Sequence, residues 1–205
     1  MEVNGYQIKK RADLSGADLS GANLSGADLT GANLASANLA GTNLTAANLT
    51  GANLTYANLK FADLGGADLT GACLSSANMT SANLTDANLW DTDLTGTNLQ
   101  AVDLTEIELF GANLAGANLQ GQNLKDGSLS ISNLSRANLA HADLQGADLR
   151  DANLTKADLT GANLAGADLG PDKEEPNRTG ANLAGANLTG ANLTGATMPD
   201  GSIHD

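Results

Sequence analysis

The stretch that decides the fold runs from Ala12 to Gly26 and reads ADLSGADLSGANLSG, which is one five-residue unit written three times. Leu returns at every fifth position from Leu14 to Leu169, and Met79 is the single exception. Ala usually stands two positions before the Leu, Asn or Asp stands between them, and Gly often ends the unit. The unit resumes in a shifted register at residues 181–200. One short repeat therefore accounts for most of the chain.

A period of five excludes both regular secondary structures. In an α-helix, successive Leu side chains would be displaced by about 140° around the axis, so no apolar face would form. In a flat strand, side chains alternate between the two faces, so successive Leu residues would lie on opposite faces. The Leu residues share one interior only if the chain turns a corner in each unit. The Ala then points inward as well, and the Asn or Asp points outward.

The units at residues 12–16 and 22–26 resemble the A(D/N)LXX motif of the pentapeptide repeat family. The resemblance implies an all-β fold, a right-handed quadrilateral β-helix with 20 residues per coil and about nine coils spaced by about 4.8 Å. We expect one domain with an N-terminal cap at 1–11, continuous repeats at 12–169, a loop insertion at 170–180, a final coil at 181–200 and a tail at 201–205. The ending MPDGSIHD is similar to endings of cyanobacterial family members.

Composition narrows the function. The 205 residues carry a formal charge of −13, so we expect no direct binding to nucleic acid or to anionic membranes. A single cysteine, Cys73, excludes an internal disulfide, and the two histidines, His141 and His204, belong to no catalytic or metal-binding motif. We therefore expect no enzyme, no cofactor and no metal. The absence of a long apolar stretch and of a signal peptide predicts a cytoplasmic protein.

One coil departs from the rule of small inward residues. Its four inward positions hold Thr92, Thr97, Val102 and Ile107 where Ala is usual. Two interpretations stay open: a wider coil that repacks locally, or a change of cross-section that marks a functional girdle.

Exposed aromatic side chains are the first candidates for partner contact. Trp90 and Phe110 are separated by 20 residues, so we expect them to stack on one outer face, either as a contact site or as a pair that covers itself. Tyr56 and Phe61 are weaker candidates. They occupy the place where Gly is usual, as does Arg136, so we expect that this place does not require a positive φ.

The second candidate is a charged insertion, GPDKEEPNRTG, at residues 170–180. It adds nine residues to the spacing between Leu169 and Leu183 and is expected to form a solvent loop at one corner. The loop is either a tolerated insertion or a recognition element. Its candidate contact residues are Asp172, Lys173, Glu174, Glu175 and Arg178.

The two ends of a β-helix expose unpaired strand edges. Residues 1–11 are expected to cap the first coil, whereas the C-terminal tail is short. An incompletely capped end coil would allow a homodimer.

Three functions remain. We favour a non-catalytic protein-interaction or regulatory scaffold with an unidentified protein partner. The resemblance also implies an alternative, a DNA mimic that binds DNA gyrase or another DNA-binding protein, although such members tend to use Phe at central positions where this chain has Leu or Met. The third is a purely structural repeat protein. The mimic would draw on acidic residues that recur along one side, namely Asp28, Asp68, Glu108, Asp148 and Asp168.

Overall fold

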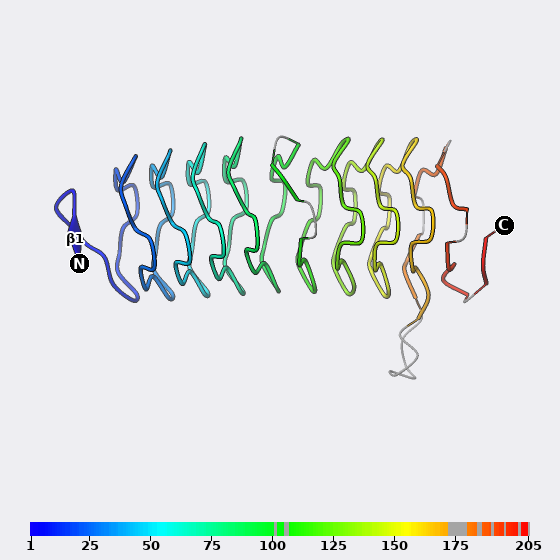
Figure 1. Ribbon diagram of the computed structural model, residues 1–205, viewed down its shortest axis with the longest axis horizontal. Coiled ribbons are helices and arrows are strands. Elements are labelled where there is room, and N and C mark those ends of the chain that lie inside the picture. The colour runs from blue at the N-terminus through cyan, green and yellow to red at the C-terminus, as the bar shows by residue number, and fades with distance from the viewer. Residues whose placement is uncertain are drawn as a thin grey trace.

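The computed structural model describes residues 1–100, 102–104, 107–171, 180–183, 186–189, 191–194, 196–200 and 202–204. Figure 1 shows an elongated stack of coils that runs from the N-terminus at one end to the C-terminus at the other. The described residues form β structure without a helix, and none of their segments is a helix long and apolar enough to cross a membrane.

Residues 20 positions apart lie side by side in neighbouring coils. Parallel bridges join Asp13 to Asn33, Asn33 to Asn53, and so on through the stack. In a regular step the Leu amide donates to the next coil, as from Leu14 to the Asn33 carbonyl at 2.7 Å, and Asn33 N donates back to Ala12 O at 2.9 Å. The Leu side chains are buried with most of the Ala side chains in one continuous core. The pairing of residues 20 positions apart matches the spacing that the five-residue period predicts.

The outward Asn and Asp residues hold the corners. The Asp13 carboxylate accepts hydrogen bonds from the backbone amide of Ser15 at 3.2 Å and from its hydroxyl at 2.8 Å. In the next coil, Asn33 Nδ2 donates to the same oxygen at 3.0 Å. Short polar side chains that bond the backbone two residues on are typical of turns. This arrangement repeats along the rod and gives most of these residues a structural role.

The place that usually holds Gly does impose a positive φ, and the expectation from Tyr56 and Phe61 was wrong. Tyr56 has φ 58°, Phe61 has 59° and Arg136 has 59°, close to the 63° to 69° of the glycines at this place. The corner hydrogen bonds account for this, since Tyr56 N donates to Ser75 O at 3.1 Å and Ala57 N to Leu54 O at 2.9 Å. The hydrogen bonds at the corner thus impose a positive φ even where the residue is not glycine.

The repeat returns to register after the insertion. Asn153 pairs with Asn182, and Asp168 pairs with Thr197, so the spacing of 20 residues has grown to 29 across the insertion. Ala181 N donates to Leu169 O at 2.9 Å, which is the same corner bond that other units make. The pairing with the preceding coil therefore resumes in register after the insertion.

Both ends of the stack carry short non-repeat segments. Strand β1 (Glu2–Val3) pairs antiparallel with β2 (Tyr6–Gln7), and the adjoining Ile8 is buried in the core. At the other end, Ile203 pairs antiparallel with Thr197. Leu183, Leu188 and Leu193 of the last coil are only partly buried. A homodimer through this end stays a prediction.

Candidate functional site

Trp90 and Phe110 form the aromatic pair that the spacing predicts. Their ring centroids are 5.7 Å apart with a tilt of 49°, and the side chains are 46% and 37% exposed. Each follows a fully buried Leu, so the coil presents both rings on the same outer row. Trp90 Nε1 donates to Glu108 Oε2 at 3.2 Å, and Trp90 N donates to Asn88 Oδ1 at 3.0 Å. The indole is therefore held in one orientation.

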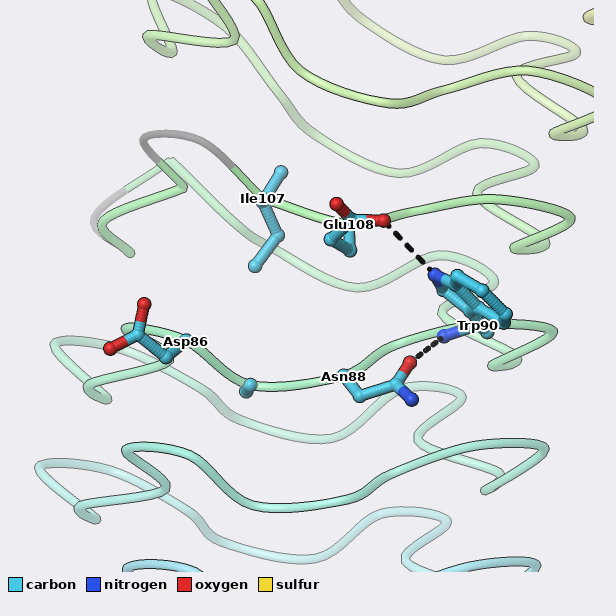
Figure 2. A pocket seen from close by; sticks show the side chains of 6 residues that line it. Asp86, Asn88, Trp90, Ile107 and Glu108 are labelled. Atoms are coloured by element: carbon cyan, nitrogen blue, oxygen red, sulfur yellow. Dashed lines mark hydrogen bonds between the residues drawn. The ribbon is translucent and has the colours of Figure 1, made fainter.

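A groove of about 420 Å³ lies beside this pair, between the chain at residues 86–90 and the chain at residues 107–108. Ala87 and Ile107 are buried and form its floor. Figure 2 shows Trp90 and Glu108 at one end of the groove and Asp86 at the other. The remaining lining residue is Asn88. The groove therefore combines an apolar floor with carboxylates at both ends.

The groove lies at a loosened junction between two coils. One coil below it, Leu69 N donates to Asn88 O at 2.8 Å and Asn88 N donates to Ala67 O at 2.9 Å. One step further, Asn88 still pairs in register with Glu108, but the contacts of Leu89 N with Glu108 O and of Glu108 N with Ala87 O lack the normal hydrogen-bond geometry that the step below has. We call this junction between residues 72–91 and 92–111 the seam.

The seam is open on one side and closed on another. Along the Cys73–Asp93 row, Leu74 N donates to Asp93 O at 2.7 Å and Asp93 N to Ala72 O at 2.9 Å. Along the Asn78–Asn98 row the corresponding bonds do not form between these described residues. The two coils therefore separate as a wedge.

Bulky inward side chains explain where the seam opens. Ile107 and Val102 are almost completely buried at places where the coils below hold Ala. Thr92, on the closed row, donates its hydroxyl to Leu69 O at 3.0 Å in the coil below, as Thr42 does to Leu19 O at 2.7 Å in a regular coil. Because added volume in a close-packed core must be accommodated by backbone shifts, the coil is displaced on the side of its branched residues.

Hydrogen bonds lower the pKa of two acids in the row that also contains Glu108. The Thr70 hydroxyl donates to Asp68 at 2.6 Å, and this bond, helped by the Thr70 amide, lowers the pKa of Asp68. Burial raises the pKa of Asp148, but two hydrogen bonds from the Arg150 guanidinium at 2.7 and 2.9 Å outweigh it, so the net shift is downward. Among the described residues, no group of three or more His, Cys, Asp and Glu side chains could hold a metal ion.

Comparison with known proteins now adds to this geometry. The family model for pentapeptide repeats matches eight copies, over residues 10–45, 32–71, 62–100, 72–109, 132–170 and 179–200. The chain belongs to the pentapeptide repeat family. No curated protein sequence matches it.

Solved structures of other pentapeptide repeat proteins are similar to it. HetL, a pentapeptide repeat protein involved in heterocyst differentiation regulation from the cyanobacterium Nostoc sp. strain PCC 7120, is 37% identical over 96% of this chain and 90% of HetL, with a TM-score of 0.60. QnrB1, a plasmid-mediated fluoroquinolone resistance protein, is 18% identical over 80% of this chain and 89% of its own, with a TM-score of 0.55. At that identity, QnrB1 supports the fold alone.

Two other predicted contact residues of this pentapeptide repeat protein, Tyr56 and Phe61, do not line the groove. Tyr56 and Phe61 are 69% and 61% exposed, on coils nearer the N-terminus, and the Lys60 ammonium lies 4.9 Å from the Phe61 ring centroid. They remain candidates. The charged loop residues lie outside the part of the chain that the structure describes, namely Asp172, Lys173, Glu174, Glu175 and Arg178.

Sequence reasoning missed the groove itself. It identified Ile107 as an enlarged inward residue and Glu108 as one of a recurring acidic row, but did not bring them together with Trp90. The available signal was the coincidence of a branched inward residue with an aromatic residue one coil below in the same row. Asp86 carried no signal, because it stands at a corner where several residue types occur.

Proposed function

We propose that this protein is a non-catalytic regulatory scaffold that binds a protein partner through the surface formed by Trp90, Phe110 and the adjoining groove. The scaffold would be a right-handed, four-sided rod of about nine coils. Similarity to HetL over nearly the full length of both chains supports a regulatory role, because HetL is described as taking part in regulation of differentiation.

The observation that carries the proposal is the aromatic pair at the open seam. In the same row, the three coils nearer the N-terminus hold Thr30, Thr50 and Thr70 at the place of the two aromatic residues. Trp and Phe are enriched in the buried centres of interfaces, and Trp is among the residues that most often dominate binding energy. A pair this exposed beside a groove offers a partner both an anchor and a recess.

The proposal is tested by affinity capture from the native cell with wild type and two double variants. Trp90→Ala/Phe110→Ala removes the pair, and Tyr56→Ala/Phe61→Ala is the matched comparison because it removes the other two candidate aromatic residues, which are exposed elsewhere on the rod. We expect a partner that the first variant loses and the control retains, with the same dependence when the purified proteins are mixed. Equal recovery by all three proteins would refute the proposal.

DNA mimicry has weaker support in the geometry. In the acidic row, Asp28 pairs with Lys10 at 3.1 Å and Asp148 pairs with Arg150 at 2.7 Å, so part of the negative charge is neutralised within the chain. In the same row, Asn48 separates Asp28 from Asp68, and Asn88 separates Asp68 from Glu108. A DNA gyrase supercoiling assay provides the test, and we expect no inhibition at micromolar protein.

A further inference from the structure

The groove beside Trp90 has a chemistry that selects among ligands. Of the six described residues that line it, Asp86 and Glu108 are acidic and none is basic. An apolar ligand would exclude water from these carboxylates without giving them a hydrogen-bond or charge partner, and the loss of solvation would oppose binding. A phosphate or nucleic acid would be repelled by them and by the net charge of −13. The groove therefore favours a cation with an apolar stem.

Glu108 is prepared for such a cation. Its Oε2 accepts the hydrogen bond from Trp90 Nε1, which fixes the carboxylate next to the ring. Its Oε1 receives no hydrogen bond from any residue that the structure describes, and it can accept one from a ligand. A carboxylate held in place loses less entropy when a charged donor binds.

The Trp90 ring supplies the second contact. Phe110 packs against it at 5.7 Å, yet nearly half of the Trp90 side chain stays exposed. The indole face is the aromatic surface that attracts cations most strongly, and a guanidinium both stacks on it and pairs with a carboxylate in one plane. An ammonium contacts the ring and the carboxylate only as a point charge, without planar stacking and without two parallel hydrogen bonds to the carboxylate.

We propose that the groove binds an arginine side chain from a basic segment of the protein partner. The aliphatic part of the arginine lies on Ala87 and Ile107, and its guanidinium stacks on Trp90 and donates to Glu108. Asp86, at the far end of the groove, attracts a second basic residue of the same segment. A volume of about 420 Å³ accommodates one long side chain with some water. This inference rests on the proposed function, since it names the chemistry of the partner.

The single tryptophan of the chain makes the site directly observable, because all tryptophan emission comes from Trp90. The probe is the blocked pentapeptide acetyl-Gly-Arg-Gly-Arg-Gly-amide, titrated at low ionic strength. We expect a saturable change in Trp90 emission. The same peptide with lysine should bind several-fold more weakly, and the peptide with citrulline, which keeps the shape without the charge, should give no saturable change.

Two charge variants separate a specific site from general attraction. Glu108→Gln should weaken the arginine peptide by about 10-fold or more, as expected for a lost charge-assisted pair. Asp18→Asn removes the same charge in the first coil, where the next coil already has Asn38, and should leave the affinity nearly unchanged. Circular dichroism checks that both variants keep the fold.

The outcomes divide clearly. No saturable change, equal binding of the citrulline peptide, or equal weakening by both variants would overturn the arginine site. If a captured partner still depends on Trp90 and Phe110 in that case, the proposed scaffold function stands without it. If the peptide binds as expected and no partner depends on the pair, the site stands and the scaffold proposal fails.

Discussion

The substitution Ile107→Ala tests whether branched inward side chains keep the two coils apart at the seam. The Ile107 side chain is 4% exposed, and the coil below has Ala87 at the equivalent place. The substitution removes three carbon atoms, which corresponds to about 2.4 kcal/mol of lost transfer free energy at about 0.8 kcal/mol for each buried CH₂ group. In a core that cannot collapse, a cavity would raise the loss to between about 2 and 5 kcal/mol.

The seam gives this site a way to collapse. With Ala at 107, the two coils can close to the regular spacing, and Leu89 N and Glu108 N can form the two bonds that neighbouring steps of the row make. At about 1 kcal/mol for each net hydrogen bond, closure offsets most of the transfer loss. We expect the free energy of unfolding to change by less than about 1 kcal/mol. Leu109→Ala, in the same unit but fully buried in regular packing, should cost about 3–5 kcal/mol.

Urea unfolding measures the change in stability, and amide hydrogen exchange measures whether the two backbone bonds form. In Ile107→Ala, the amides of Leu89 and Glu108 should exchange more slowly than in wild type, because each gains an acceptor. If the variant is as unstable as Leu109→Ala and neither amide gains protection, the bulk of Ile107 is not what separates the coils. Closure should also weaken binding of the arginine peptide, since the floor of the groove is lost.

Other expectations follow from single residues. Ser132→Ala should raise stability in urea by about 1 kcal/mol, because the buried Ser132 hydroxyl has no hydrogen-bond partner among the residues that the structure describes; any loss would contradict this. Ile131→Asn should also stabilise the protein, by about 1 kcal/mol, because a β-branched residue is held at φ 61° while Asn tolerates this region, and Ile131→Val should bring no gain. Because the pKa of Asp68 is lower in the folded protein than its usual 3.8, the ionised carboxylate stabilises the fold above pH 3.8, and this stability is lost as the pH falls through the pKa of the folded state. The stability advantage of wild type over Asp68→Asn should therefore be constant above about pH 5 and shrink below pH 3.8. Urea midpoints measured from pH 7 to pH 3 would show a constant difference if this is wrong.

The stack could be predicted from sequence because its cause is local and repeated. A Leu at every fifth position, with a small residue two places before it, has one packing solution, and even the register across the insertion follows from counting to Leu183. The backbone conformation of Tyr56 and Phe61 was predicted wrongly because its cause is not local. Their backbone angle is dictated by corner bonds such as Tyr56 N to Ser75 O, which join residues that are distant in sequence.

The groove could be anticipated only in part. Val102 and Ile107 indicate in the sequence that this coil has larger inward side chains than its neighbours. They do not indicate which side of the coil moves to accommodate the added volume. The displacement depends on which row of the coil can separate from the coil below. The row of Thr92 stays closed because the Thr92 hydroxyl donates a hydrogen bond to Leu69 O in that coil. Thr97, on an open row, donates instead to Leu94 O in its own coil at 2.7 Å. Two threonines with the same pattern position thus act differently, and only the three-dimensional contacts distinguish them.

In a rod of nearly identical coils, a specific surface can arise only where the repeat is broken. The seam places four departures together: branched inward residues, weakened backbone pairing, the single tryptophan and a groove with acidic ends. Alanine at 107 would remove the irregularity without requiring any other change in the coil. Local irregularity that the fold does not need is a reason to look for function at that place. Trp90 could stack on Phe110 in a regular rod too, but only an open seam puts Ile107 within reach of a ligand that also contacts the indole.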